Sequence, residues 1–277
     1  MLAENAYGKS SVRLVKVARR GDRHDLKDLT VAIRFEGDYD TSYTDGDNSG
    51  VLPTDTMKNT VYALASTVPV DEPEAFGLVL VRHFLQRNPR LRRVRVDINE
   101  HSWGRISIGD REHGQAFVRA ASDTRSATLQ GELQRVNIGA GISDLVVMKS
   151  GRSAFTGFLR DEYTTLPDTT DRLLATSMTA TWRYRDQDVD FGPTWRAVRR
   201  TLLEAFAEHD SKSVQHTLHA MGHAVLDSID AVTAIRLVMP NKHHLPVDLA
   251  RLGLQNRNEI FVPTDEPYGL IEATLVR

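Results

Sequence analysis

Alternation of apolar and polar residues near the start of the chain restricts what the chain can fold into. From Leu29 to Phe35 every second residue is apolar, which gives an extended strand one apolar face. Between Val12 and Val17 apolar residues fall on both faces, so this strand is either buried on both sides or interrupted by a bulge. The two patterns predict a pair of antiparallel strands at the start of the fold.

Two helical patterns follow a polar loop that is rich in Gly and Asp. The first helix is expected from about Thr56 to Ala65, and the second from Asp71 to Arg87, where Asp71 and Glu74 have the spacing of a capping box. One face of the second helix is apolar and carries Phe76, Val79, Leu80 and Phe84. Because such helices are apolar on one side only, the pair is expected to cover one face of a sheet.

The second half of the chain repeats this order. Strands are expected at residues 126–133 and 144–150, with the Gly-rich string "NIGAGIS" as a hairpin between them. A loop and a short helix are expected from Arg160 to Thr176, followed by another strand, two long helices and two closing strands. We therefore predict an α+β fold of two tandem units, residues 1–123 and 124–277, each an antiparallel sheet with a helix pair on one face.

Charge and composition exclude several classes of protein. Lys plus Arg is 35 and Asp plus Glu is 37, a balance that gives no attraction to nucleic acid or to an anionic membrane. The densest basic run, "RLRRVRV" at residues 90–96, alternates Arg with apolar residues and is interpreted as a half-buried strand with a charged outer face. The absence of cysteine excludes disulfides, thiolate metal sites and cysteine nucleophiles.

No stretch of the chain suggests a membrane span or a secretory leader. No window holds roughly 18 consecutive apolar residues, and the N-terminus lacks the apolar run of a signal peptide. We therefore expect a cytoplasmic protein that has neither a membrane nor a nucleic-acid partner.

The string "VLPTDTMKNTVY" at residues 51–62 places three polar residues, Thr54, Asp55 and Thr56, at the entrance of the first helix. A single Ser, Thr or Asp would be enough to cap that helix. We expect Asp55 or Thr56 to be the cap, which leaves Thr54 for another role. The free backbone N–H groups of a helix start can also face an anion.

Four strings of the chain, "YGKSSVRLVKV", "VLPTDTMKNTVY", "FTGFLRDEYTTLPDTTDRLLAT" and "MPNKHHLPVDL", resemble the urate oxidase (uricase) family. They occur in the family's order, and the resemblance runs from Tyr7 to the end of the chain. It implies a tunnelling fold (T-fold), in which two tandem units per chain assemble into a homotetrameric barrel with active sites between subunits. It also implies oxidation of urate by dioxygen to 5-hydroxyisourate and hydrogen peroxide, in purine catabolism, without a metal or organic cofactor.

The family's site residues carry over position by position. The resemblance implies that the catalytic residues are Lys9, Thr54 and His243. It implies that the substrate-binding residues are Thr54, Asp55, Phe155, Arg172, Val214, Gln215 and Asn241. Two positions depart from the common pattern, because Pro53 precedes Thr54 and Gly151 stands where Ser or Thr is usual. Neither departure removes a reacting group, but Pro53 can alter the loop that aims Thr54.

The chemistry of urate accounts for the binding residues. Urate is a flat anion edged with carbonyl oxygens and N–H groups, so the planar fork of Arg172 fits a carbonyl and a neighbouring ring nitrogen. Gln215 can donate and accept at the opposite edge, and Phe155 offers a face for stacking. Taken singly, such an Arg is usually solvated, such a Phe is usually core and such a Gln can be a helix cap. The surrounding strings favour the functional interpretation.

The chemistry of dioxygen accounts for the catalytic residues. Dioxygen reacts slowly with closed-shell molecules, and a flavin or a metal usually supplies the electrons. Doubly deprotonated urate can supply an electron itself, so a cofactor is unnecessary. We expect Lys9, neutral in a dry site, to remove a proton through Thr54, with His243 completing the relay. Asn241 is expected to hold dioxygen, and then the attacking water, above the ring.

A metal-dependent T-fold enzyme that acts on a purine or pterin is the alternative. His216, His219 and His223 recur at i, i+3 and i+7 in "HTLHAMGH", and relatives of this fold bind zinc. Against this alternative, the core face of the same helix is taken by Val214, Leu218, Met221 and Val225. The histidines are then left on or beside the solvated side, and no carboxylate completes an H-E-x-x-H pattern.

A non-catalytic assembly protein is the third class of function. It gives no reason for Lys9, Thr54 and Arg172 to occur together in these strings.

A terminal Ser-Lys-Leu peroxisomal address is absent, which favours a bacterial cytoplasmic enzyme.

Overall fold

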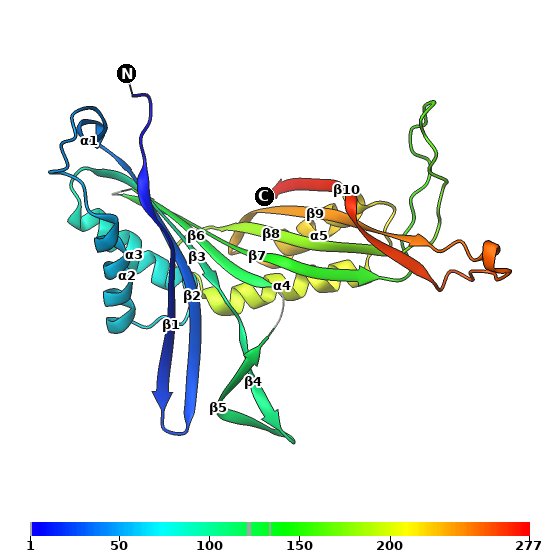
Figure 1. Cartoon of the computed structure of the whole chain (residues 1–277), viewed down its shortest axis with the longest axis horizontal. Helices are drawn as coiled ribbons and strands as arrows, with labels where there is room; N and C mark the ends of the chain where they lie inside the picture. The colour runs from blue at the N-terminus through cyan, green and yellow to red at the C-terminus, as the bar shows by residue number, and fades with distance from the viewer. Residues whose placement is uncertain (1, 121–122, 133) are drawn as a thin grey trace. The chain divides into compact units, whose positions relative to one another are not determined.

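The computed structural model describes residues 2–120, 123–132 and 134–277 (Figure 1). The chain packs as two compact units, of which the first contains residues 1–141 and 183–195 and the second contains residues 142–182 and 196–277. The division into tandem repeats at residues 123 and 124 stays a prediction, because a packing partition and a repeat boundary are different quantities.

The fold is α+β, as predicted, and its strands belong to two sheets. The larger sheet has eight strands in the order β1-β2-β3-β6-β7-β8-β9-β10, and the smaller one pairs β4 with β5. Strands of the first half are β1 (Tyr7–Arg20), β2 (Arg23–Gly37), β3 (Leu91–Glu100), β4 (Trp103–Ile108), β5 (Arg111–Arg119) and β6 (Thr124–Glu132). Later strands are β7 (Arg135–Lys149), β8 (Leu174–Tyr184), β9 (Val232–Pro246) and β10 (Phe261–Val276). The pairs β1–β2, β2–β3, β3–β6 and β9–β10 are antiparallel.

The first two strands follow the predicted patterns. On β2, the alternating residues Leu29, Val31, Ile33 and Phe35 are at most 2% exposed. On β1, the register shifts between Lys9 and Val12, and Ser11 has a φ of 58°. This bulge directly follows Lys9 and lies outside the stretch for which it was considered. From Val12 to Val17 the register with β2 is continuous, so the apolar residues fall on both faces, with Val12 buried and Val15 56% exposed.

Apolar rows run across three strands of the first unit. Val31 and Ile33 of β2 lie opposite Ile98 and Val96 of β3, which in turn lie opposite Ala127 and Leu129 of β6. In the basic run, Arg92 and Arg95 are exposed while Leu91, Val94 and Val96 are buried. The half-buried strand with a charged outer face is confirmed.

Three helices belong to the first unit: α1 (Asp40–Thr44), α2 (Thr54–Thr67) and α3 (Pro73–Arg87). Helix α1 lies in the segment that was expected to be a loop. Helix α3 packs on β3 and β6, and α2 packs on β1 (Figure 1). Met57 and Val61 of α2 and Phe76 and Leu80 of α3 are fully buried, so one face of the sheet is covered as expected.

Both predicted helix caps are wrong. Helix α2 has Pro53 at its N-cap and α3 has Glu72, and neither side chain caps the helix. Asp55 lies inside the first turn of α2, where its carboxylate accepts from Lys58 and Asn59 instead. Glu74 is fully buried and pairs with Arg125 of β6, so no capping box forms. In both cases the helix begins at a residue other than the predicted one, and the acidic side chain of its first turn pairs with another side chain.

The second half of the chain departs from prediction at two places. The string "NIGAGIS" is not a hairpin, because it lies within β7. Gln134, just before β7, is a turn residue, and Leu133, the end of a predicted strand, lies outside the described residues. The segment from Arg160 to Leu173 has no helix and is a loop that extends from the sheet (green in Figure 1). Isolated bridges hold the base of this loop.

Helices α4 (Phe191–Glu208) and α5 (Val214–Ser228) follow β8, and a short 3-10 helix, η1 (Ala250–Leu252), lies between β9 and β10. Helix α5 packs on β9 and β10. The predicted core face of α5 is confirmed, because Val214, Leu218, Met221 and Val225 are at most 3% exposed. None of the described helices is long and apolar enough to cross a membrane.

Candidate active site

The strings around Lys9 and Thr54 are tied together in the first unit. The Tyr7 hydroxyl accepts a hydrogen bond of 3.0 Å from the backbone N–H of Leu52, just before Thr54 begins α2. Gly8 lies so close to β2 that an added Cβ atom would be 1.9 Å from the carbonyl oxygen of Ile33. The Tyr-Gly-Lys string therefore positions both the loop in front of Thr54 and the backbone of β1 from which the Lys9 side chain extends.

The positive charge of Lys9 acts on Asp55. The hydrogen bond from Lys58 holds the pKa of the Asp55 carboxyl below its ordinary value, and the charges of Lys58 and Lys9 act in the same direction. Lys9 itself makes no side-chain hydrogen bond or ion pair with the residues that the structure describes. The half-buried Lys9 thus has its ammonium group free for a ligand, while Asp55 is already engaged on its own helix.

Phe155 and Arg172 are brought together in the second unit. The guanidinium carbon of Arg172 lies 5.2 Å from the centre of the Phe155 ring. Phe155 exchanges backbone hydrogen bonds of 2.7 and 3.0 Å with Thr169, and the Arg172 N–H donates to the carbonyl of Ser153. Backbone hydrogen bonds of neighbouring segments therefore position the two side chains that are predicted to bind one planar ligand.

The charge of Arg172 lacks a protein counter-ion among the described residues. Its Nε is buried and has no hydrogen-bond partner in the described part of the chain. Burial lowers the pKa of Arg172 from its ordinary value, and no neighbouring carboxylate acts against this effect. A half-buried guanidinium without an anionic partner is suited to bind an anion from solution.

The start of α5 is joined to the same backbone. Ser153 forms a parallel bridge with Ser211, in which the Ala154 N–H donates to Ser211 over 2.8 Å and the Ser211 N–H donates to Arg152 over 3.0 Å. Ser213 then caps α5, because its side chain accepts from the His216 N–H. Val214 and Gln215 begin the helix, with Val214 buried and Gln215 exposed. Gln215 thus shares its support with Phe155 and Arg172.

Asn241 and His243 lie on β9 beside a register shift. Asn241 pairs with Gly269 and His243 with Thr264 of β10, and the ladder is irregular between those two partners. Asn241 Nδ2 is 3.5 Å from His243 Nδ1, and both residues are half-buried. The two predicted residues are neighbours whose side chains contact each other.

The three histidines of the alternative metal site are exposed on α5, as their spacing predicted. His216 contacts His209 over 3.0 Å, while the rings of His219 and His223 are 4.6 Å apart. Among the described residues, no group of three or more His, Cys, Asp or Glu is placed to hold a metal ion.

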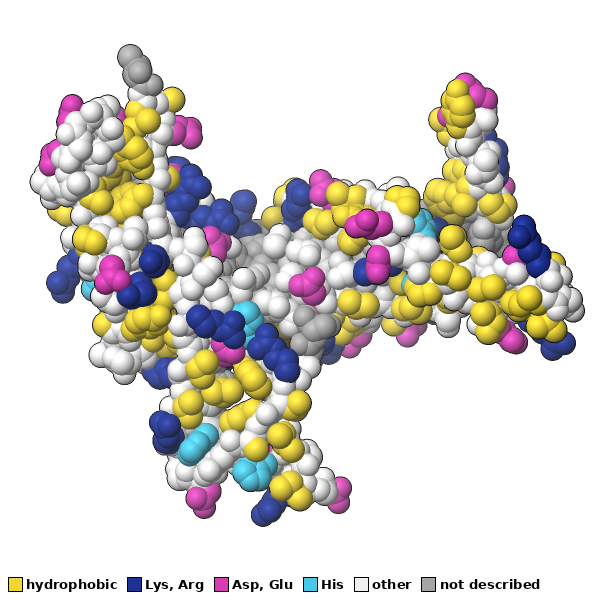
Figure 2. Space-filling view, viewed as in Figure 1, with side chains coloured by type: hydrophobic (Ala, Val, Ile, Leu, Met, Phe, Trp, Pro, Cys, Tyr) yellow, Lys and Arg dark blue, Asp and Glu magenta, His cyan; other side chains and the backbone are white. Residues whose placement is uncertain are grey.

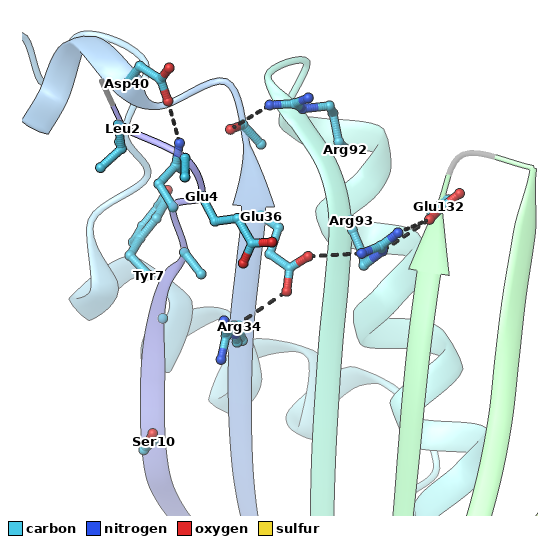
Figure 3. A pocket seen from close by; sticks show the side chains of 15 residues that line it. Leu2, Glu4, Tyr7, Ser10, Arg34, Glu36, Asp40, Arg92, Arg93 and Glu132 are labelled. Carbon is cyan, nitrogen blue, oxygen red and sulfur yellow. Dashed lines mark hydrogen bonds and ion pairs between the residues drawn. The ribbon is translucent and has the colours of Figure 1, made fainter.

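A cavity of about 1070 Å³ lies on the first unit next to the Tyr-Gly-Lys string (Figure 3). Tyr7, Gly8 and Ser10 line it, whereas Lys9 and Thr54 are not among its lining residues. Its arginines are engaged with the protein, since Arg93 pairs with Glu36 at 3.1 Å and with Glu132 at 2.8 Å. These arginines are therefore not free to bind an anion in this cavity.

The residues that position the site residues, and do not themselves contact a ligand, were not predicted from the sequence. Tyr7 and Ser153 lie next to predicted site residues, and Ser211 lies three residues before Val214. Tyr7 stands in a quoted string and could have been found there. Ser211 could not, because its role depends on a bridge between segments 58 residues apart in the chain.

Comparison with known proteins identifies relatives over the whole chain. The sequence model of the family described as Uricase matches residues 5–130 and 138–272. A uricase from Arthrobacter globiformis is 44% identical over 277 residues, covering 100% of this chain and 90% of that protein. A uricase from Emericella nidulans is 38% identical, covering 100% of this chain and 97% of that protein. The crystal structure of the Arthrobacter globiformis uricase superimposes with a TM-score of 0.96 at 45% identity, covering 100% of this chain and 95% of that chain.

Proposed function

The chain belongs to the uricase family, and from this membership we propose that it is a urate oxidase of purine catabolism. The reaction consumes urate, dioxygen and water and yields 5-hydroxyisourate and hydrogen peroxide, a balance in which urate loses two electrons and dioxygen gains them. The metal-dependent alternative gains no support from the comparisons, since the relatives above all carry the name uricase.

One observation carries the proposal at the level of the site. Arg172 presents a half-buried guanidinium, with an unpartnered Nε among the described residues, 5.2 Å from the ring of Phe155. A flat anion fits this pair, because the aromatic face can stack on its ring and the planar fork can donate to a carbonyl and a ring nitrogen. Urate has both features.

We assign the remaining roles by the same chemistry. Gln215 donates and accepts at the edge of urate opposite Arg172, and Val214 contacts the ring beside it. Lys9 removes a proton through Thr54, and His243 completes the relay. Asn241 holds dioxygen and then water above the ring, and Asp55 and Thr54 present the start of α2 to the anion. The free ammonium of Lys9 and the 3.5 Å contact of Asn241 with His243 support these assignments.

We also propose that the chain forms a homotetrameric barrel of two T-fold units per chain, 1–123 and 124–277. In this proposal Lys9 and Thr54 of one subunit act on urate bound by Arg172 and Gln215 of another. The support is exposed apolar surface: on the β4–β5 hairpin, Trp103, Ile106, Ile108 and Val118 are between 40% and 60% exposed (Figure 2). In the loop after Phe155, Leu159 is 96% and Tyr163 is 82% exposed. Such surface is typical of contacts between subunits.

The test is the loss of the ultraviolet absorbance of urate when the purified protein is added in air, with hydrogen peroxide measured in parallel. We expect one peroxide per urate consumed. The activity should survive exhaustive dialysis against a chelator, and the protein should have no visible absorption band. Activity that returns only with added zinc, copper or iron would instead support the metal-dependent alternative.

A further inference from the structure

A pair of histidines lies beside the start of α5, outside the residues assigned above. His209 Nε2 is 3.0 Å from His216 Nδ1, and the two rings are 4.3 Å apart. The backbone N–H of Lys212 also points at His216 Nδ1, over 3.4 Å. Because a backbone N–H can only donate, His216 Nδ1 must be an acceptor without a proton. The proton between the rings then belongs to His209 Nε2.

This assignment makes the contact sensitive to protonation of one atom. A proton on His216 Nδ1 would turn that nitrogen into a donor facing two other donors, the His209 ring and the Lys212 N–H. The hydrogen bond from the Lys212 N–H would be lost, and the ring contact would persist only if the His209 proton moved to its Nδ1. The neutral form of His216 is therefore the one that holds the segment 209–213.

The segment 209–213 supports both sides of the urate clamp, which we define as Phe155, Arg172 and Gln215. Ser211 bridges Ser153, two residues before Phe155, and the carbonyl of Ser153 accepts from the Arg172 N–H over 2.9 Å. Ser213 caps α5, whose second residue is Gln215. A shift of this segment would thus be transmitted to all three clamp residues.

Charged groups from the neighbouring elements surround the pair. The Lys149 ammonium of β7 donates to the His209 carbonyl over 2.6 Å, and Arg152 pairs with Asp210 at the same segment. Burial lowers the pKa of His209 from its ordinary value, and His216, Lys149 and Arg152 add to this effect while Asp210 opposes it. On balance these surroundings disfavour a proton on the His209 ring.

We propose that His216 is a positioning residue for the clamp, whose neutral imidazole holds the 209–213 segment so that urate affinity falls when Nδ1 of His216 takes up a proton. The proposal rests on the proposed function for its ligand, but the state of the segment can be measured without urate. Asn is the informative replacement, because its side-chain oxygen can accept near the position of Nδ1 but does not titrate in this range. His216→Ala removes the acceptor altogether.

The experiment compares the full-length wild type with His216→Asn, His216→Ala and the control His223→Asn, an exposed histidine on the same helix. KM and kcat for urate are measured between about pH 5 and pH 9, which covers the ordinary titration range of histidine. As the pH falls, we expect KM of the wild type and of His223→Asn to rise about three- to tenfold relative to His216→Asn, as for the loss of one hydrogen bond. His216→Ala should show the raised KM at every pH. Ionisation of urate itself is common to all variants and cancels in the ratio.

Hydrogen–deuterium exchange of the peptide covering 209–216, without urate, provides the independent measurement. At each pH, exchange should be faster in His216→Ala than in His216→Asn, and the wild type should move from the Asn level to the Ala level as the pH falls. Equal KM profiles in wild type and His216→Asn would overturn the proposal, and so would equal exchange in all variants. If the wild type does not oxidise urate, the proposed function and the clamp fall together, while faster exchange in His216→Ala would still show that His216 holds the segment.

Discussion

Arg172 is the residue whose surroundings say most about the ligand. Its guanidinium is half-buried against Phe155, and its Nε is unpartnered among the described residues. Burying a charge without a partner costs free energy, so an arrangement of this kind is expected where a ligand supplies the opposite charge. Asp55 shows the opposite case, because Lys58 and Asn59 already satisfy its carboxylate.

Replacing Arg172 by Ala should weaken urate binding and lower turnover. Removal of one partner of a buried charge pair costs roughly 2–5 kcal/mol, since the bound anion loses a bidentate donor. Equilibrium binding of a xanthine-type inhibitor and KM for urate measure the change. Arg200→Ala is the matched control, because Arg200 of α4 is 69% exposed and pairs only with Glu204 among the described residues. Equal inhibitor affinity in both variants would show that the anion site lies elsewhere.

Gly8→Ala should disturb the backbone of β1 from which the Lys9 side chain extends. An added Cβ would lie 1.9 Å from the Ile33 carbonyl oxygen, so β1 and β2 would have to separate. We expect a loss of about 1–3 kcal/mol in the free energy of unfolding, as for an overpacked core, together with lower turnover. Thermal unfolding and urate kinetics measure the two effects. Gly104→Ala is the control, since its added Cβ would be 3.7 Å from the Ala120 Cβ; equal stability of the two variants would contradict the close approach.

Among the elements of the first unit, α3 and β6 are joined by a buried charge cluster. Arg125 of β6 lies 2.6 Å from Glu72 and 2.6 Å from Glu74 of α3, with its guanidinium 5.2 Å from the Trp195 ring. Burial raises the pKa of Glu74 above its ordinary value, although the charge of Arg125 acts in the other direction. The local pattern predicted a capping box of Asp71 with Glu74, whereas in the structure Glu74 pairs with Arg125 of β6.

Arg125→Met should destabilise the protein strongly, because it leaves two carboxylates without their buried cation. The expected loss is about 3–5 kcal/mol in the free energy of unfolding. This loss of stability should grow as the pH rises. A carboxyl group whose pKa is raised on folding stabilises the folded state at pH values below its ordinary pKa of 4.5. That stabilisation is lost as the pH rises through the pKa of the folded state. Denaturant unfolding between about pH 4 and pH 8 measures the trend.

The exposed Arg93 provides the control for this element. Arg93 of β3 pairs with Glu36 and Glu132 and is 43% exposed, so Arg93→Met should lower the free energy of unfolding far less than Arg125→Met. A similar loss of stability in Arg93→Met and Arg125→Met would argue against the importance of burial in the cluster.

For the whole molecule, the proposed site residues fall into the two compact units of the chain. Lys9, Thr54 and Asp55 belong to the first unit, and the clamp with Asn241 and His243 belongs to the second. The proposed sharing of sites between subunits makes a prediction that concerns the assembly and not any single residue.

Two inactive variants should restore activity to each other. Lys9→Met keeps the clamp of its chain, and Arg172→Ala keeps Lys9. When the two are refolded together, about a quarter of the sites should combine an intact Lys9 with an intact Arg172, if the chains mix at random. Urate oxidation by the mixture is the measurement, and each variant refolded alone is the control. Mixed oligomers verified by mass that remain inactive would place the whole site within one chain.

The local sequence pattern correctly predicted the elements whose buried face follows from the periodicity of their apolar residues. The period of two on β2 and the apolar stripe on α5 each match the buried face that was found. The same local reasoning failed for the caps of α2 and α3 and for "NIGAGIS", which lies within β7. Capping and turn propensities differ by only about 1 kcal/mol, so a partner from another element can override them.

The sequence by itself therefore determined the family, the α+β class and the identities of the proposed site residues, because long strings and periodic apolar faces are properties of local order along the chain. Only the tertiary structure decided that Arg172 lies over Phe155 without a counter-ion among the described residues, and that Ser211 joins the start of α5 to the segment carrying them. It also decided the contact of His209 with His216. These features depend on desolvation and on pairings between distant segments, and neither quantity is encoded in the spacing of residues along the chain.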